Sequence, residues 1–349
     1  MKPALYIHIP FCAQKCAYCD FASWAGREPV WEAYFHALKE EMRPWMEITG
    51  GEFYSVFVGG GTPSLVPAER IAEILRGVSA GEVTLEANPG TLTPEKLEIY
   101  RQAGVNRLSM GVQSFDDGLL KTLGRIHTAR QAEEAFFMAR EAGFDNLNLD
   151  LMYALPGQTQ EAWEDTLEQA AALGPEHISA YSLILEEGTP MAAWATPQPD
   201  EDVNRMQRTA TAFLKEKGYA RYEISNYARP GRECRHNLVY WRRGDYIGVG
   251  CAAHSLYQGR RFANPDSLGA YLAGARRTEN AILTEEDVLE ERLMLGLRTA
   301  EGVPRGWIRE NAQTRRMVRE GLAVFEKDRF FLTEKGMEVQ DAVVLALLQ

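Results

Sequence analysis

The chain has 349 residues, of which 45% are hydrophobic and 25% are charged, and its formal net charge at pH 7 is −11. This length accommodates one large α/β domain with a smaller one, and the composition is that of a globular protein. The acidic balance disfavours nucleic acid as a partner, because binding to phosphates favours a basic surface. No apolar run reaches the length of a membrane span, and the N-terminus lacks the apolar segment of a signal peptide. We therefore expect a cytoplasmic protein.

Short apolar runs rich in β-forming residues alternate with helical patterns through the first 184 residues. We predict strands over residues 4–10, 55–60, 83–88, 107–113, 146–152 and 177–184. Helices are predicted between them, over residues 31–45, 67–76, 94–103, 129–142 and 161–172. This alternation is typical of a parallel sheet with crossover helices.

The pattern changes after residue 215. Residues 219–280 are rich in glycine, aromatic and polar residues, and we expect them to form a β-rich extension packed on the first domain. Further on, Thr284 precedes a helix with an acidic first turn, and the runs 322–325 and 330–333 predict a hairpin. Helices followed by a hairpin resemble a small winged-helix unit of the α+β class. We therefore predict three domains, over residues 1–218, 219–280 and 281–349.

Three of the five cysteines, Cys12, Cys16 and Cys19, lie within eight residues directly after the first predicted strand. Thiolates are ligands for iron–sulfur clusters and for zinc. Three cysteines leave one iron of a four-iron cluster without a protein ligand, so a small molecule can bind there. The spacing favours a cluster, but a disulfide or a zinc site is an alternative. The fourth ligand of such a zinc site would be one of four distant residues, Cys234, His236, Cys251 or His254.

Polar residues stand at or near the ends of the predicted strands that follow. The run from Gly59 to Pro63 closes the second strand, Glu86 lies late in the third, Gln113 ends the fourth and Asp150 lies late in the fifth. The carboxyl ends of parallel strands meet at one rim. We therefore expect these residues to share one site with the cysteines.

The cysteine loop and the glycine run together resemble the radical S-adenosylmethionine (SAM) superfamily. Other motifs narrow the resemblance to the oxygen-independent coproporphyrinogen III oxidase family, over essentially the whole chain: Tyr-Ile-His-Ile-Pro-Phe-Cys, Glu-Ala-Asn-Pro, Ser-Met-Gly-Val-Gln-Ser-Phe and Gly-Val-Gly-Cys-Ala-Ala-His-Ser. The resemblance implies a partial (β/α)6 radical SAM barrel with a [4Fe–4S] cluster on Cys12, Cys16 and Cys19. It also implies the following SAM contacts: Tyr6, Tyr18, Gly60, Gly61, Thr62, Glu86, Gln113, Arg125 and Asp150.

Two departures separate the chain from the oxidases of that family. The oxidases have a further cysteine two residues after the third cluster ligand, where this chain has Phe21, and a long segment before the cysteine strand. Both departures match heme chaperones related to the oxidases. The run from His236 to Trp241 also resembles their His-Asn-x-x-Tyr-Trp motif, which implies heme contacts from His236, Tyr240 and Trp241. The alternative is a hydrogen-bonded loop histidine beside core aromatics. We expect His254 to be a structural hydrogen-bond donor.

The resemblance therefore implies a heme chaperone that uses a [4Fe–4S] cluster and SAM and delivers heme to an acceptor hemoprotein, with membrane-associated acceptors among the candidates. One alternative is an oxidase that converts porphyrin propionates to vinyl groups by radical decarboxylation. A second alternative is a radical SAM enzyme that modifies transfer RNA, which the net charge disfavours. The sequence does not decide whether SAM is cleaved productively, and therefore whether the protein is an enzyme. It also does not give the oligomeric state.

Overall fold

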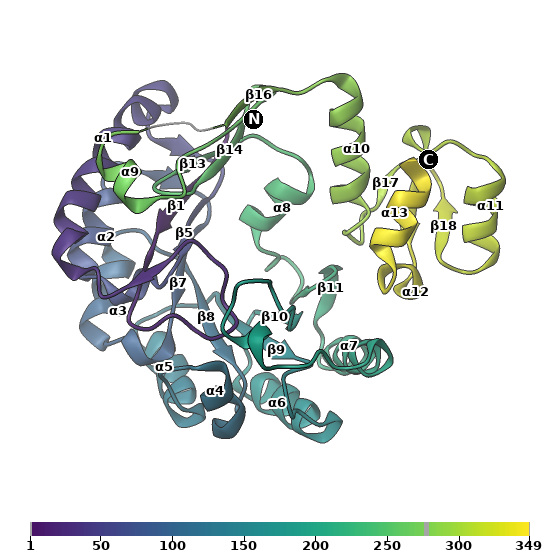
Figure 1. Ribbon diagram of the computed structural model, residues 1–349, viewed down its shortest axis with the longest axis horizontal. Helices are drawn as coiled ribbons and strands as arrows, with labels where there is room; N and C mark the ends of the chain where they lie inside the picture. The colour runs from purple at the N-terminus through teal and green to yellow at the C-terminus, as the bar shows by residue number, and fades with distance from the viewer. Residues whose placement is uncertain (1, 276–278, 349) are drawn as a thin grey trace.

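A computed structural model of the chain describes residues 2–275 and 279–348. One sheet of twelve strands forms its main body, in the order β11-β12-β10-β9-β8-β7-β5-β1-β13-β14-β15-β16. The sheet curves around a central space, and helices cover its outer side (Figure 1). Within the described residues, no helix combines the length and the apolar character needed to cross a membrane.

Six parallel strands form the centre of the sheet and confirm the six predicted from the sequence. Each boundary lies within two residues of its predicted position, because the strands are short apolar runs ended by glycine or polar residues. Their neighbours in the sheet pair in parallel along the whole series. They are β1 (Ala4–Ile9), β5 (Val56–Gly60), β7 (Val83–Ala87), β8 (Arg107–Gln113), β9 (Leu147–Tyr153) and β10 (His177–Ser182).

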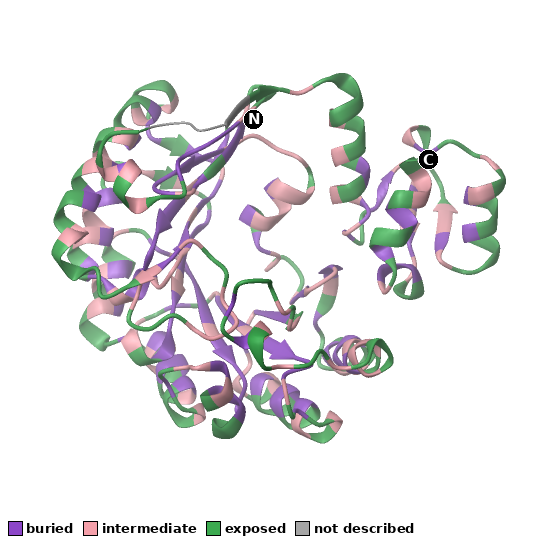
Figure 2. Cartoon of the chain, in the orientation of Figure 1, coloured by how far each residue is buried: buried purple, intermediate pink, exposed green. Residues whose placement is uncertain are grey.

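Helices connect these strands and pack an apolar face on the sheet, as Figure 2 shows by the buried residues along the strands and on the inner sides of the helices. Threonine side chains cap the N-termini of α3, α5 and α6 by accepting a backbone hydrogen bond. The helices of this layer are α1 (Trp31–Thr49), α2 (Ala68–Ile74), α3 (Pro94–Gln102), α4 (Asp117–Leu123), α5 (Ala129–Glu141), α6 (Gln160–Leu173) and α7 (Asp200–Glu216). Short 3₁₀ helices occupy Glu28–Val30, Pro63–Leu65, Pro89–Thr91 and Met191–Ala193.

The strands of the predicted extension join the sheet itself at both of its edges. On one side β12 (Asn226–Ala228) pairs antiparallel with β10, and β11 (Ala220–Glu223) pairs with β12. On the other side β13 (Tyr246–Val249) pairs parallel with β1. The remaining elements are β14 (His254–Tyr257), β15 (Arg260–Ala263), β16 (Glu279–Ile282), α8 (Arg235–Trp241) and α9 (Leu268–Leu272). The sequence predicted a β-rich extension packed on the first domain, and in the structure its strands continue the sheet and satisfy the free backbone groups of the sheet edges.

The C-terminal residues form a small α+β unit with its own apolar core. Thr284 and Asp287 form a capping box at the start of its first helix, and the predicted hairpin is present as β18 and β19. Its elements are α10 (Glu285–Gly296), β17 (Val303–Pro304), the 3₁₀ helix Arg305–Trp307, α11 (Ala312–Arg319), β18 (Ala323–Glu326), β19 (Arg329–Leu332), α12 (Glu334–Met337) and α13 (Gln340–Leu348). The likeness to a winged helix and the domain boundaries at 218 and 280 stay predictions.

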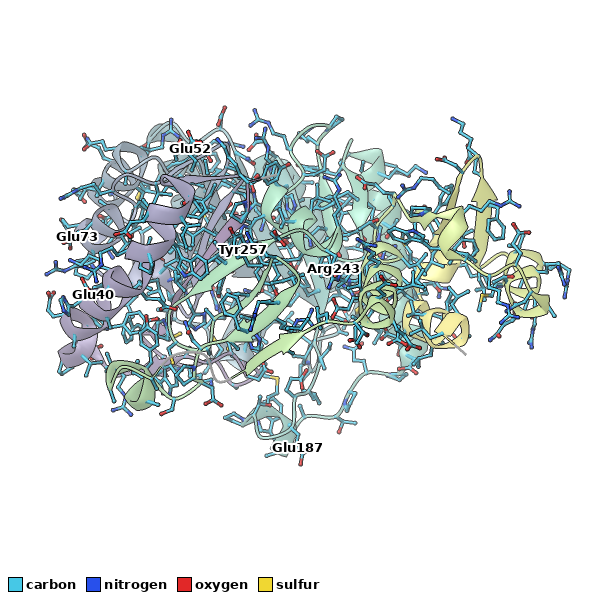
Figure 3. All side chains as sticks on the ribbon, turned by 90° about the horizontal axis from the view of Figure 1, so that it is seen from above. Glu40, Glu52, Glu73, Glu187, Arg243 and Tyr257 are labelled. Atoms are coloured by element: carbon cyan, nitrogen blue, oxygen red, sulfur yellow. The ribbon has the colours of Figure 1, made fainter. Side chains whose placement is uncertain are left out.

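An ion pair links this unit to the main body. Arg243, which follows helix α8, donates from Nε to a carboxylate oxygen of Glu291 on α10 at 2.6 Å. Figure 3 shows Arg243 toward the side of the main body that faces the C-terminal unit. The residues after α8 are therefore held against both parts of the molecule.

Candidate functional site

A cavity of about 420 Å³ lies at the carboxyl ends of the parallel strands. Eleven of the twelve residues that the sequence assigns to the cluster and to SAM line it: Cys12, Cys16, Tyr18, Cys19, Gly60, Gly61, Thr62, Glu86, Gln113, Arg125 and Asp150. They converge because parallel strands all end at the same rim. The remaining residue, Tyr6, lies in an adjoining cavity. The individual roles of these residues as ligands stay predictions.

The cysteine loop is closed at its base and carries three partly exposed free thiols. The loop begins at β2 (Phe11–Cys12) and returns at β3 (Trp24–Ala25), and these two short strands pair with each other. Burial raises the pKa of the Cys19 thiol, and the neighbouring thiols raise it further. A thiol with a raised pKa tends to stay protonated. It becomes a good ligand when binding to a positively charged metal centre releases its proton and leaves a thiolate.

The donor set fits a cluster with an open corner better than a zinc ion. Among residues 2–275 and 279–348, no three His, Cys, Asp or Glu side chains converge on a position for a single metal ion. Two of the four distant candidates for a fourth zinc ligand are used elsewhere: Cys234 is buried and donates to Glu82, and Cys251 is buried and donates to the carbonyl oxygen of Pro265. The chain therefore presents three thiols at the cavity, as the cluster hypothesis requires.

Arg125 connects the cysteine loop to the sheet. Its guanidinium donates to Cys16 Sγ at 3.6 Å and to the carbonyl oxygen of Gly111, on β8, at 2.6 Å. On the other side of the loop, the Thr62 hydroxyl donates to Cys12 Sγ at 3.7 Å. These contacts place a positive charge and a hydroxyl beside two of the thiols, where they stabilise negative charge on sulfur. The sequence indicated Arg125 as a SAM contact only, because its approach to Cys16 depends on the tertiary fold.

The glycine run allows two close approaches of the backbone. Gly60 has φ +113°, and a Cβ atom there would lie 2.5 Å from the His8 ring. A Cβ atom on Gly61 would lie 2.8 Å from the backbone nitrogen of Phe11. Glycine is therefore required at both positions, and the run leaves backbone rather than side chains at the wall of the cavity.

Two carboxyl groups also line this cavity. Glu86 Oε2 accepts a hydrogen bond from Gly60 N–H at 2.9 Å. Desolvation inside the barrel and the nearby charge of Asp150 raise the pKa of Glu86 to about 7. Desolvation also raises the pKa of Asp150, which accepts hydrogen bonds from Ser109 and Asn148 at 3.1 and 2.8 Å. Such a pair favours a ligand that brings positive charge and hydroxyl donors.

Gln113 reaches the cavity through an irregular backbone. It has φ +69°, and the register between β8 and β9 shifts between Gly111 and Gln113. A bulge of this kind redirects a side chain at the end of a strand. Positive φ at a residue other than glycine often marks a functional position. The sequence placed Gln113 at the strand end but contained no signal for this conformation.

A second cavity of about 350 Å³ adjoins the first and shares Phe21, Gly60 and Glu86 with it. Its other lining residues are Tyr6, His8, Ala22, Tyr240, Tyr246, Ala252 and His254. The Tyr6 hydroxyl hydrogen-bonds to His8 Nδ1 at 2.9 Å, and His8 Nε2 donates to the carbonyl oxygen of Ala22 at 2.9 Å. The sequence missed His8, although its position two residues after Tyr6 in one strand places both on the same face.

The structure places His236 outside the lining of both cavities, and its expected contact with heme stays a prediction. This residue is fully buried, with Nδ1 3.0 Å from the Ser55 hydroxyl oxygen and Nε2 2.9 Å from the Tyr240 hydroxyl oxygen. Burial lowers the pKa of His236 to about 3, so the ring is neutral. Both ring nitrogens are hydrogen-bonded, which favours the alternative of a satisfied, buried histidine.

The other two residues of the motif have different surroundings. Tyr240 lines the second cavity, where its ring packs edge-on against Tyr246 at 4.7 Å between centroids. Trp241 does not line either cavity; the guanidinium of Arg298 lies over its ring at 4.7 Å. Of the three residues expected to contact heme, the structure therefore places only Tyr240 at a described cavity.

The pKa of Glu86 predicts how the affinity for SAM changes with pH. The ammonium and sulfonium groups of SAM favour the ionised carboxylate, and the ionised fraction rises from about one tenth at pH 6 to about nine tenths at pH 8. We expect the association constant, measured by calorimetry on anaerobically reconstituted protein, to rise about tenfold over this range. Glu86→Gln should bind weakly with no such rise, and an equally steep rise in this variant would contradict the assignment.

The contact between Arg125 and Cys16 predicts an effect on a bound cluster. Arg125→Gln removes a positive charge beside a ligand, so the reduced cluster loses stabilisation and its midpoint potential falls, on the order of 100 mV. Redox titration followed by electron paramagnetic resonance measures the potential. Arg130→Gln is the matched control, because Arg130 is exposed on α5 and pairs with Glu134. Equal potentials in the two variants would show that Arg125 does not act on the cluster.

Comparisons with known proteins agree with this geometry. Residues 6–170 match the family model described as the radical SAM superfamily. The heme chaperone HemW of Haemophilus influenzae is 41% identical over 322 residues, covering 86% of this chain and 84% of the relative, and that of Bacillus subtilis is 38% identical, covering 87% and 85%. Coproporphyrinogen III oxidase (HemN) from Escherichia coli, a radical SAM enzyme, has a similar structure, with a TM-score of 0.83, 25% identity and coverage of 99% and 90%. The chain belongs to the HemW family within the radical SAM superfamily.

Proposed function

We propose that this protein is a heme chaperone that holds a [4Fe–4S] cluster and SAM in the first cavity and heme in the second. The observation that carries the proposal is the pair of adjoining cavities, one lined by eleven residues of the predicted cluster and SAM site and the other by aromatic residues. The similarity to HemW chaperones over most of the chain supports it. The acceptor would be a hemoprotein, and an acceptor at a membrane remains a prediction.

Different residues of the first cavity would bind the cluster and SAM. The three cysteines would hold the cluster, which when bound supplies an electron and an open iron site to SAM. The glycine run would receive the methionine part of SAM along its exposed backbone. Glu86 and Asp150 would accept hydrogen bonds from the ammonium and ribose hydroxyl groups, and Arg125 would balance charge beside Cys16.

The second cavity suits the flat, apolar face of a porphyrin. Tyr240 and Tyr246 present rings to it, and Phe21, 64% exposed, stands between the two cavities. Aromatic rings provide large contact areas for a macrocycle. Phe21 is also the position at which the oxidases of the family have cysteine, so an apolar contact replaces a thiol beside the cargo.

The alternative function is oxidation of coproporphyrinogen III, and the structural similarity to HemN favours it. We expect the anaerobically reconstituted protein with SAM and a reductant to produce no protoporphyrinogen IX, while binding ferric heme with a stoichiometric shift of the Soret band. Production of protoporphyrinogen IX at rates of an authentic oxidase run in parallel would reverse this assignment.

Separate cavities predict separate ligand requirements. A variant with Cys12, Cys16 and Cys19 changed to serine should lose iron, sulfide and SAM binding but bind heme with an affinity within about threefold of the parent. The reason is that the second cavity has no cysteine in its lining. Iron and sulfide analysis and heme titration measure the two properties. Loss of the Soret shift in this variant, with the fold intact by circular dichroism, would place heme on the thiols instead.

A further inference from the structure

The six histidines of the chain differ sharply in their access to a ligand, and all six lie in the described residues. His8, His177 and His236 have both ring nitrogens hydrogen-bonded. His127 is buried and bonds to the carbonyl oxygen of Val112. His36 is exposed on α1, in the layer of helices outside the sheet (Figure 1). None of these five imidazoles offers an accessible nitrogen to a molecule in the second cavity.

His254 is the sixth histidine, and it is both exposed and part of the wall of the second cavity. Its ring makes no hydrogen bond within residues 2–275 and 279–348, in contrast to the structural role that the sequence suggested. It begins strand β14, two residues after Ala252 of the same cavity wall. A neutral imidazole is a common axial ligand of heme iron.

Other side chains that ligate heme iron are excluded from this cavity. Its lining has no cysteine or methionine. The hydroxyl groups of Tyr6 and Tyr240 are hydrogen-bonded to His8 and His236, and burial raises the pKa of both tyrosines well above the ordinary value. Burial also raises the pKa of Tyr246, the third tyrosine of the lining. A phenolate ligand is therefore disfavoured at all three positions, and the imidazole of His254 is the accessible donor.

The turn before His254 is strained and tightly packed, which favours one fixed position for the residue. Gly250 has φ +101°, and a Cβ atom there would lie 2.7 Å from both the carbonyl oxygen of His8 and the Tyr34 hydroxyl. Ala252 has φ +60°, which residues other than glycine rarely adopt. The amide of Ala252 donates to the carbonyl oxygen of Pro265 at 2.9 Å. Backbone strain of this kind persists only where surrounding contacts maintain it. It is common at sites where a side chain must be held in position for a ligand.

Two arginine side chains lie near the second cavity. Arg243 and Arg261 both pair with the carboxylate of Glu291, at 2.6 and 2.7 Å, and Arg261 also lies near the carboxylate of Asp287. Arg243, Arg261 and Glu291 all act on Tyr246 in the cavity wall. Heme carries two propionates, and a guanidinium group can bind a carboxylate through two hydrogen bonds.

From these observations we propose that His254 is the axial ligand that holds heme iron in the second cavity, with the porphyrin against Phe21, Tyr240 and Tyr246. The proposal rests on the proposed heme chaperone function and names the iron ligand of that function. Because His254 is exposed at the rim, heme held there would stay accessible to the acceptor, which transfer requires. His236 then serves as a positioning residue that orients Tyr240 through their hydrogen bond.

The test is titration of the anaerobically reconstituted protein and its variants with ferric heme, followed by Soret absorption and electron paramagnetic resonance. His254→Ala should weaken binding by about tenfold or more and remove the signature of imidazole ligation. Added free imidazole should restore that signature, because the truncated side chain leaves room for it. His36→Ala, the matched exposed histidine, should behave as the parent does. Circular dichroism confirms that each variant is folded.

The outcomes separate this proposal from the function on which it rests. If the parent protein shows no stoichiometric Soret shift, the heme chaperone assignment itself fails. If the parent binds heme and His254→Ala retains its affinity and spectrum, only the role of His254 is overturned. If instead a folded His236→Gln loses the imidazole signature while His254→Ala keeps it, the ligand is His236 and the cavity must open to expose it.

Discussion

The packing of the His8 ring against Gly60 is the contact on which both cavities depend. It requires a glycine with positive φ at the end of β5, and this conformation directs Gly60 N–H to the carboxylate of Glu86. The same ring bonds to Tyr6 and to the carbonyl oxygen of Ala22, which fixes the far end of the cysteine loop. The buried imidazole of His8 thus fixes the relative positions of the glycine run, Glu86 and the cysteine loop.

Because Phe21, Gly60 and Glu86 belong to both cavities, a ligand in either one contacts the wall of the other. For the proposed ligands SAM and heme, this arrangement would give a physical basis for coupling. Each ligand would change the position of Phe21 or the ionisation of Glu86, and thereby the affinity for its neighbour. The His-Asn-x-x-Tyr-Trp run reaches the second cavity through Tyr240: His236, buried between Ser55 and Tyr240, sets the position of the Tyr240 ring.

Much of the fold and of the first cavity was predictable from the sequence. Six parallel strands follow from short apolar runs alternating with helical patterns, and the rim of such a sheet brings its strand ends together. Eleven of twelve residues assigned to the cluster and SAM therefore line one cavity. The hairpin of the C-terminal unit was also predictable, since its two runs flank a polar turn. These features depend on local pattern and on the regular geometry of a parallel sheet.

The sequence by itself determined the three-cysteine loop, the glycine run and the positions of the parallel strands along the chain, because each is encoded in neighbouring residues. Only the tertiary structure decided which histidine is accessible: His236 is closed off by Ser55, 181 residues away, whereas His254 opens to the second cavity. It also decided that Arg125 touches Cys16, 109 residues away, and that the strands of the extension complete both sheet edges. Burial and hydrogen bonding of a side chain depend on partners that are distant in the chain, so no local pattern specifies them.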